Sequence, residues 1–457
     1  MLRPNRRSFL LGSASAGLGV LALGPLAGCA SGPASPADLA AVPPVVFVHG
    51  NGDTAALWHT TFWRWESNGF ARNRLFAVDF PYPLSRSVDA TPQRLRSSTE
   101  EQREQLEQIV AEVMRRTGAP KVALVGSSRG GNAIRNYIKN GGGAAKVSHA
   151  VLCGTPNHGV IVSDKVLVGN EFNGAYMFLR QLNEPTETVP GPAWMTTMSD
   201  HNDKYAQPDG KYLGMPGTPT GVGYDGPALK GAKNVILPGL DHRETAFAPA
   251  AFGAVWEFIT GAAPATTGIT VESGLVLNGK VNDMPGGVPT NLPVAGAVVE
   301  IWETDPATGV RRQMVHRKET GADGYWGPFT GSTKATYEFV VTTPDAPTTH
   351  IYRSPFLRSS AIVHLRAAKM SADDHKAGSV VILDRPRGYF GQGRDKVLMD
   401  GQPAPGIAEG VPSVSTATLR LADAPPRAVT TSFNAEQIAV QTWPAKDNHV
   451  SVAELHY

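Results

Sequence analysis

Short apolar runs alternate with helix-like segments from residue 43 to residue 261. The runs are apolar at nearly every position, as buried parallel strands are; they lie at 44–48, 74–80, 121–126, 146–156 and 232–239. Between them, Ser98 and Glu101 form a capping-box pattern ahead of Leu106, Val110 and Val113, which recur at helical spacing. This alternation predicts an α/β fold with a mostly parallel sheet and helices on both faces.

Helical periodicity is rare beyond residue 261. A linker at 262–268 comes first, and β-like runs between Gly/Pro turns follow at 275–281, 295–303, 337–343, 361–367, 379–385, 428–433 and 449–455. Such regularly spaced strands predict an all-β C-terminal region, a sandwich or barrel, over 269–457. The pattern leaves open whether this region is one module or two with a break near Thr349.

The N-terminal segment predicts export. Arg6 and Arg7 precede an apolar, small-residue run too short and glycine-rich for a membrane span, and the run ends in Leu-Ala-Gly-Cys at Cys29. This resembles a twin-arginine signal peptide (1–28) with a bacterial lipobox. The resemblance implies a lipid anchor on Cys29 in the cell envelope, at the outer membrane or periplasmic side in a Gram-negative host. Residues 29–42 are expected to form a flexible tether to a first domain at 43–261.

The composition is that of a globular protein, and the charge gives no reason to expect a nucleic-acid partner. Of 457 residues, 41% are hydrophobic and 18% charged, and the formal net charge is only +2. The two cysteines are Cys29 and Cys153. With Cys29 lipidated, Cys153 has no disulfide partner, and its apolar neighbours predict a buried core residue.

The run at 121–126 leads directly into Gly-Ser-Ser-Arg-Gly (126–130) and then into a helix-like segment at 132–140. These five residues fit G-x-S-x-G in the strand–turn–helix context of a nucleophile elbow, which makes Ser128 the candidate nucleophile. Such a turn requires flanking glycines and holds its serine in a strained conformation. Ser127 is expected to point into packing. We expect the charged side chain of Arg129 to pair with an acid near the pocket mouth.

A serine nucleophile also needs donors for the oxyanion that forms on the substrate. The main-chain N–H groups of Arg129 and of Asn51, in the loop after the run at 44–48, are the expected donors. His49 in the same loop is expected to prop the loop rather than to take part in catalysis.

The serine needs a base and an acid that orients it. The chain order serine, acid, histidine requires a histidine after a late strand, which selects His242. The acid is expected in the polar loop that follows residue 194, where Asp203 is the first candidate and Asp200 the alternative. Asp241 is expected to shape the turn beside His242.

Six stretches, in order, resemble the α/β-hydrolase lipases and esterases of bacteria: PVVFVHGNGD, VGSSRGGNAIRNYI, VLCGTPNHG, NEFNGAYMFLRQLN, TTMSDHNDKYAQPDG and LPGLDHRETAF. The resemblance covers roughly 43–261 and implies ester hydrolysis through a Ser-Asp-His triad and an acyl-enzyme. It supports Asp203, because the family carries its acid in the corresponding segment. Arg129 departs from the less charged residue that is usual at this elbow position. The β-like region resembles prealbumin-like modules at 294–297 and 322–326, and such modules are usually non-catalytic.

The expected function is therefore that of a lipase or carboxylesterase that needs neither cofactor nor metal, with an ester substrate that has an apolar acyl chain. The apolar residues at 172–182 fit either a cap over an acyl pocket or a helix packed on the sheet. Two alternatives stay open: a polyester or hydroxyalkanoate depolymerase, and a non-catalytic envelope lipoprotein that binds a partner through its β region. The sequence indicates neither the acyl-chain length nor the oligomeric state.

Overall fold

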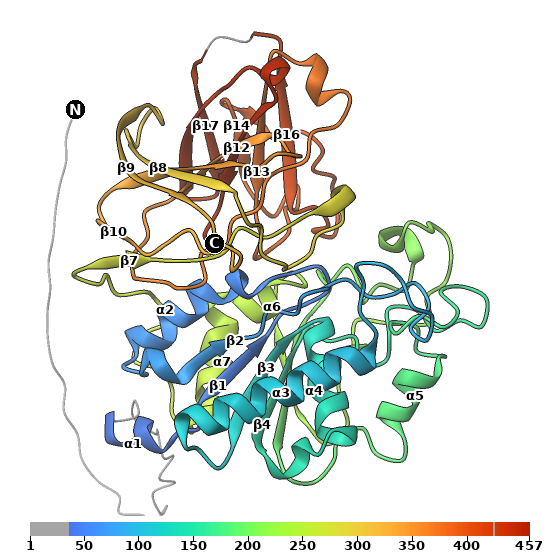
Figure 1. The fold of residues 1–457 in the computed structure, drawn as a ribbon. Helices are drawn as coiled ribbons and strands as arrows, with labels where there is room; N and C mark the ends of the chain where they lie inside the picture. The colour runs from blue at the N-terminus through green and yellow to red at the C-terminus, as the bar shows by residue number, and fades with distance from the viewer. Residues whose placement is uncertain (1–35, 424–425) are drawn as a thin grey trace, which may run out of the picture.

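The computed structural model describes residues 36–423 and 426–457, so the predicted signal peptide and the predicted anchor site Cys29 lie outside the described residues. Two regions lie one above the other in Figure 1, an α/β region in blue to yellow-green and an all-β region in yellow to red. This fold class is the predicted one. No helix in the described part of the chain is long and apolar enough to cross a membrane.

Six parallel strands form the sheet of the α/β region, in the order β2-β1-β3-β4-β5-β6. They are β1 (Val45–Val48), β2 (Leu75–Ala77), β3 (Val122–Ser127), β4 (Val147–Cys153), β5 (Ala193–Ser199) and β6 (Lys233–Leu237). The chain runs from β1 outward to β2 and then returns past β1 to β3. The strand order therefore reverses between β1 and β3, and the carboxyl ends of strands at such a reversal are where open α/β sheets bind ligands.

Helices cover both faces of this sheet, because successive strand residues point to opposite faces. They are α1 (Pro36–Ala41), α2 (His59–Ser67), α3 (Thr99–Thr117), α4 (Arg129–Asn140), α5 (Met177–Asn183), α6 (Glu244–Phe247) and α7 (Pro249–Thr260). One face packs against α2, α6 and α7, and the other against α3 and α4. The predicted capping box starts α3: Glu101 N–H donates to Ser98 Oγ at 3.2 Å, and Ser98 N–H donates to Glu101 Oε2 at 2.7 Å.

Part of the predicted tether is structured. Residues Pro36–Ala41 form α1, and Leu39 and Val42 are buried in the core on the α2 side of the sheet. The Arg74 guanidinium donates to the carbonyls of Leu39 and Ala40 at 3.0 and 2.9 Å. These contacts join the segment just before β1 to the α/β region.

The all-β region contains a seven-stranded sheet, a four-stranded sheet and a two-stranded pair. Their orders are β16-β13-β19-β12-β11-β8-β9, β15-β14-β17-β18 and β10-β7. The strands are β7 (Leu275–Leu277), β8 (Val298–Thr304), β9 (Arg311–Glu319), β10 (Phe329–Gly331), β11 (Thr336–Thr342), β12 (Thr348–Arg353), β13 (Ser379–Asp384), β14 (Val397–Met399), β15 (Gln402–Pro403), β16 (Thr416–Leu421), β17 (Ala428–Phe433), β18 (Glu436–Gln441) and β19 (His449–Glu454). Side chains of β13, β17 and β18 meet in one core, so the two larger sheets pack together.

Two positions that the sequence pattern singled out in this region can be located in the structure. Thr349 lies inside β12, and the seven-stranded sheet continues across the position considered for a break. The run at 361–367, expected as a strand, makes only isolated bridges such as Val281 with Leu365. It passes so close to Gly279 that a Cβ there would collide with the carbonyl of Val363, and this irregular approach prevents a regular ladder.

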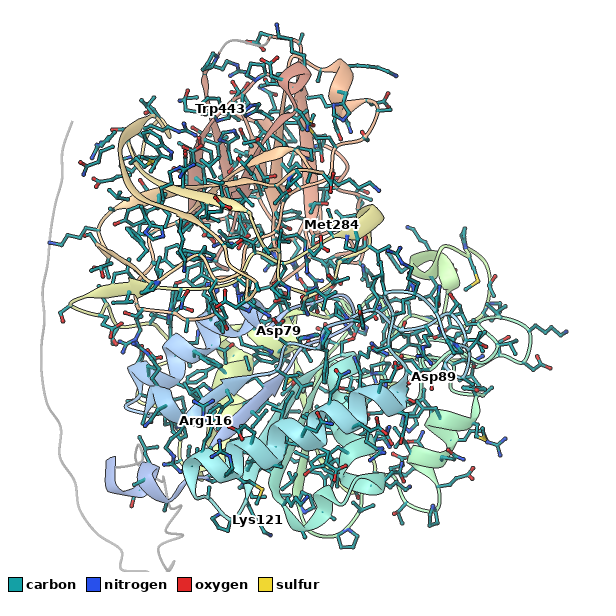
Figure 2. The ribbon with its side chains drawn as sticks, in the orientation of Figure 1. Asp79, Asp89, Arg116, Lys121, Met284 and Trp443 are labelled. Carbon is teal, nitrogen blue, oxygen red and sulfur yellow. The ribbon has the colours of Figure 1, made fainter. Side chains whose placement is uncertain are left out.

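The β region sits against the loops that follow β1 and β2. Asn291 Nδ2 donates to the carbonyls of Asp53 and Phe80, both at 2.9 Å. The ammonium of Lys280 pairs with Asp79, which Figure 2 shows at the border of the two regions. These loops extend from the carboxyl ends of the strands, so the β region covers part of the edge at which the candidate site lies.

Candidate active site

Ser128 occupies the tight turn between β3 and α4. Its φ of 53° and ψ of −120° are strained for a residue with a side chain, and its N–H donates to Cys153 O at 2.8 Å. A Cβ on Gly126 would lie 2.7 Å from the backbone of Gly130, and a Cβ on Gly130 would collide with Val48 O. Only glycine fits at these two positions, so the chain can make this turn only with the G-x-S-x-G pattern.

His242 and Asp203 form a buried pair on the loops after β6 and β5. His242 Nδ1 lies 2.9 Å from Asp203 Oδ2, and Tyr205 N–H donates to Asp203 Oδ1 at 2.8 Å. Asp200, the alternative acid, instead accepts the N–H groups of His201 at 2.6 Å and Gly239 at 3.1 Å. The structure therefore brings Asp203, and not Asp200, to the imidazole.

The loop after β1 carries the expected oxyanion donor Asn51. His49 stabilises this loop through hydrogen bonds, as expected. Its Nδ1 lies 2.9 Å from Gly50 O, and Phe80 N–H donates to its Nε2 at 3.2 Å. Burial lowers the pKa of His49, which favours the neutral ring that these two contacts need. Ser85 N–H donates to Asn51 Oδ1 at 2.8 Å, so this side chain is fixed, and Asn51 lines the same cavity as Ser128.

A cavity of about 240 Å³ joins these groups, with Ser128, Asn51 and His242 in its wall. Its other lining residues are Asp53, Ser85, Ser127, Pro156, Val160, Leu167, Asn170, Phe172, Tyr205, Leu213, Arg243 and Tyr389. Phe172 belongs to the apolar segment at 172–182, for which a cap or a packed helix was expected. The two expected roles fall on different parts of that segment. Phe172 lines the cavity, whereas Leu179 and Leu182 of α5 are buried beside α4.

Residues 42–209 match the lipase (class 2) family, and residues 273–370 match the lipase C-terminal domain family. The chain is a carboxylic ester hydrolase. Among solved structures it is similar to the mature form of the Bacillus licheniformis lipase BlEst2, with 20% identity over 48% of this chain and 92% of that one and a TM-score of 0.37. It is also similar to the carboxylesterase CesB of Bacillus subtilis, with 16% identity over 48% and 85% of the two chains and a TM-score of 0.28.

The side chain of Arg129 in this hydrolase is buried beneath the elbow. Its Nε and Nη2 donate to Glu171 at 2.9 and 2.6 Å, and Nη1 donates to Pro83 O and Ser97 Oγ, each at 3.0 Å. The expected acid partner thus exists, but its expected place at the pocket mouth was wrong. Glu171 is buried, and its neighbour Phe172 lines the cavity, because the guanidinium turns inward and joins the β2–α3 connection to the segment that carries Glu171.

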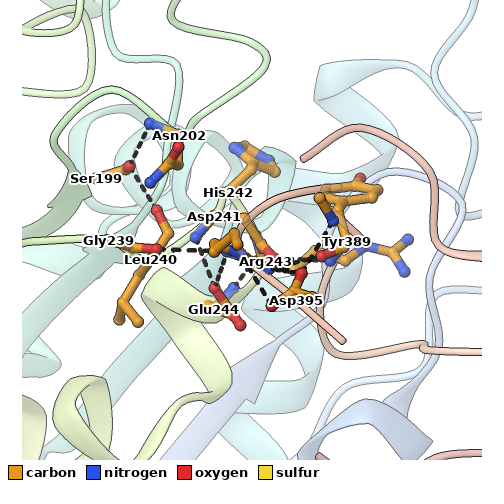
Figure 3. A network of polar contacts seen from close by, with 12 residues as sticks. Ser199, Asn202, Gly239, Leu240, Asp241, His242, Arg243, Glu244, Tyr389 and Asp395 are labelled. Carbon is orange, nitrogen blue, oxygen red and sulfur yellow. Dashed lines mark hydrogen bonds and ion pairs between the residues drawn. The ribbon is translucent and has the colours of Figure 1, made fainter. Parts of the chain in front are cut away.

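Both neighbours of His242 are held by the β region of the hydrolase, and Figure 3 shows the polar network around the first of them, Asp241. Asp241 Oδ1 accepts the N–H groups of Arg243 at 2.9 Å and Glu244 at 3.0 Å, which forms the turn expected there. Asp241 Oδ2 accepts from Tyr389 N–H at 2.7 Å and from the guanidinium groups of Arg385 and Arg394 at 3.1 and 3.3 Å.

Arg243 adds a second link, since its Nη1 donates to Pro386 O at 2.7 Å and its Nη2 to Asp53 Oδ1 at 2.8 Å. Sequence reasoning missed these residues. The segment at 385–395 lies about 140 residues beyond His242 in the chain, and no motif marks it.

Cys153 has a prediction of its own. Cys153 is buried and free, and burial raises the pKa of its thiol to about 12, so it is the core residue that was predicted. Within residues 36–423 and 426–457, no cluster of three or more His, Cys, Asp or Glu side chains could hold a metal ion.

Proposed function

We propose that the hydrolase cleaves short carboxylic esters through an acyl-enzyme on Ser128, in the manner of a carboxylesterase or a lipase of short chains. The observation that carries the proposal is the buried His242–Asp203 pair at 2.9 Å, whose histidine lies in the same cavity wall as a serine with positive φ. A nucleophile, its base and the group that orients the base are together the machinery of acyl transfer.

In the first half of the reaction, Ser128 Oγ attacks the ester carbonyl carbon while His242 Nε2 takes the hydroxyl proton. Asp203 accepts the Nδ1–H bond, which fixes the tautomer and stabilises the imidazolium. The N–H groups of Asn51 and Arg129 bind the oxyanion. The C–O bond of the ester then breaks, and His242 returns the proton to the departing alcohol.

In the second half, water attacks the acyl-enzyme with His242 as base, and the carboxylic acid leaves. The size of the cavity supports small substrates, since about 240 Å³ is below the roughly 300–1,000 Å³ of most ligand pockets. Val160, Leu167, Phe172 and Leu213 supply an apolar surface for a short acyl chain.

Two adjacent serines make a matched test. Ser128→Ala is expected to lower kcat for p-nitrophenyl butyrate by about 10⁴-fold or more, whereas Ser127→Ala keeps most of the activity. Asp203→Asn is expected to lose about 10⁴-fold and Asp200→Asn little. A folded Ser128→Ala variant with near-normal activity would show the proposal to be wrong.

A further inference from the structure

Two kinds of side chain line the cavity beside Ser128. Val160, Leu167, Phe172 and Leu213 suit a hydrocarbon chain, whereas Asp53 and Arg243 carry full charges and Tyr205 and Tyr389 carry hydroxyls. A cavity for plain hydrocarbon gains nothing from a carboxylate, because burying an ionised group costs free energy unless it is paired and hydrogen-bonded. Asp53 therefore needs a hydrogen-bond partner for each of its two carboxylate oxygens.

The two carboxylate oxygens of Asp53 differ in their hydrogen bonds. Its side chain is 10% exposed, and Oδ1 accepts from Arg243 Nη2 at 2.8 Å. No residue in the described part of the chain donates a hydrogen bond to Oδ2. An ionised carboxylate oxygen can only accept, so this atom offers a free acceptor in the cavity wall.

Oδ2 also lies close to the reacting atoms. A Cβ built on Gly50 would stand 2.8 Å from Asp53 Oδ2 and 3.3 Å from Ser128 Cβ, so the carboxylate oxygen and the nucleophile approach each other across Gly50. A donor bound to Oδ2 would consequently belong to the part of the substrate nearest the scissile bond, and not to the far end of a chain.

Arg243 offsets the negative charge of the Asp53 carboxylate near the reacting atoms. An unpaired negative charge beside the oxyanion hole would oppose the oxyanion, and the guanidinium on Oδ1 offsets it. Arg243 is itself fixed by Pro386 O at 2.7 Å, and its guanidinium carbon lies 5.2 Å from the centre of the Tyr389 ring. The β region thus holds the ion pair in position and completes this part of the wall.

We propose that Asp53 Oδ2 is a hydroxyl-binding subsite, and that the preferred substrates are short esters with a hydroxyl group close to the scissile bond. Either side of the ester can supply that group, as in a hydroxyacyl ester or a monoester of a polyol. The hydroxyl donates to Oδ2, and Arg243 occupies Oδ1. This inference rests on the proposed function, since it takes Ser128 as the nucleophile.

The test compares pairs of esters that differ in hydroxyl groups alone. The acyl pair is p-nitrophenyl butyrate with p-nitrophenyl 3-hydroxybutyrate, and the alcohol pair is propyl butyrate with 2,3-dihydroxypropyl butyrate. We expect the wild-type enzyme to favour the hydroxylated member of one pair by about 10-fold or more in kcat/KM, because a site built around a hydroxyl discriminates against its absence. The pair that shows the preference identifies which side of the ester carries the hydroxyl.

Asp53→Ala is expected to bring that ratio close to one, and Asp200→Ala, which removes a carboxylate outside the cavity, leaves it unchanged. The ratio is measured on one enzyme at a time, so a general loss of activity in a variant does not affect it. Wild-type ratios near one for both pairs, or a preference that survives Asp53→Ala, would overturn the proposal. Ser128→Ala is assayed on the same four esters, and its activity tests the proposed function separately.

Discussion

The buried ion pair of Arg129 and Glu171 is expected to behave as a unit. Both side chains are almost fully buried, at 0% and 2% exposure, and the guanidinium also donates to Pro83 O, Ser97 Oγ and Ser97 O. The perturbation is to replace each charged residue singly and then both together, as Arg129→Met, Glu171→Leu and the double variant.

The geometry sets the size of each effect. Removing one partner leaves the other charge buried and unpaired, which costs about 3–5 kcal/mol of unfolding free energy. The double variant leaves no such charge and exchanges the pair for apolar side chains of similar size, which is often neutral or stabilising for buried ion pairs. It does lose the bonds to Pro83 and Ser97, at about 1 kcal/mol each. We therefore expect the double variant to be more stable than either single variant.

Urea unfolding of the four proteins, followed by circular dichroism, measures these differences. Hydrolysis of p-nitrophenyl butyrate adds a second measurement. We expect the double variant to keep the proposed oxyanion donor, because the proposal assigns only the main-chain N–H of residue 129 to that role. Additive losses of stability, with the double variant the least stable of the three, would refute the reasoning about the buried pair.

Two more predictions concern residues around His242. Arg394→Gln removes a donor to Asp241 and is expected to lower kcat about 10-fold with little change in KM. The control is Arg387→Gln, in the same segment but bonded to Leu57 O, which is expected to leave the kcat of the folded enzyme within about twofold. Equal losses of kcat in the two variants would mean a general effect of the interface. Burial and, secondarily, Arg243 lower the pKa of Lys204 to about 8, so the unfolded chain binds the extra proton between about pH 8 and the ordinary value of 10.5. Wild-type stability relative to Lys204→Met is therefore expected to rise across that window, and a urea-midpoint difference unchanged between pH 7.5 and 9.5 would contradict the expectation.

Local patterns in the sequence predicted the α/β fold well. The elbow follows from Gly126 and Gly130, which no other residue can replace without a clash, and the start of α3 follows from a capping box within four residues. Each of these features depends on neighbours in the chain. The alternation of apolar runs and helices then sufficed for the parallel sheet.

The rest of the site depends on contacts between distant segments. Glu171 reaches Arg129 across 42 positions, and Tyr389 reaches Asp241 across 148. Neither contact has a local pattern, because each partner looks like an ordinary surface or loop residue in its own segment. The pattern of the β region also gave no sign that it borders the cavity, since only the packing of the two regions brings Tyr389 beside Ser128.

Labelling of the native protein with a fluorophosphonate tests most directly whether Ser128 is an activated nucleophile. Only a serine with a working base and oxyanion hole reacts readily with such a probe. Trypsin releases residues 122–129 as one peptide with both Ser127 and Ser128, and tandem mass spectrometry locates the label within it. We expect the label on Ser128 and its loss in His242→Ala; an unlabelled native protein, or a label on Ser127, would contradict the mechanism.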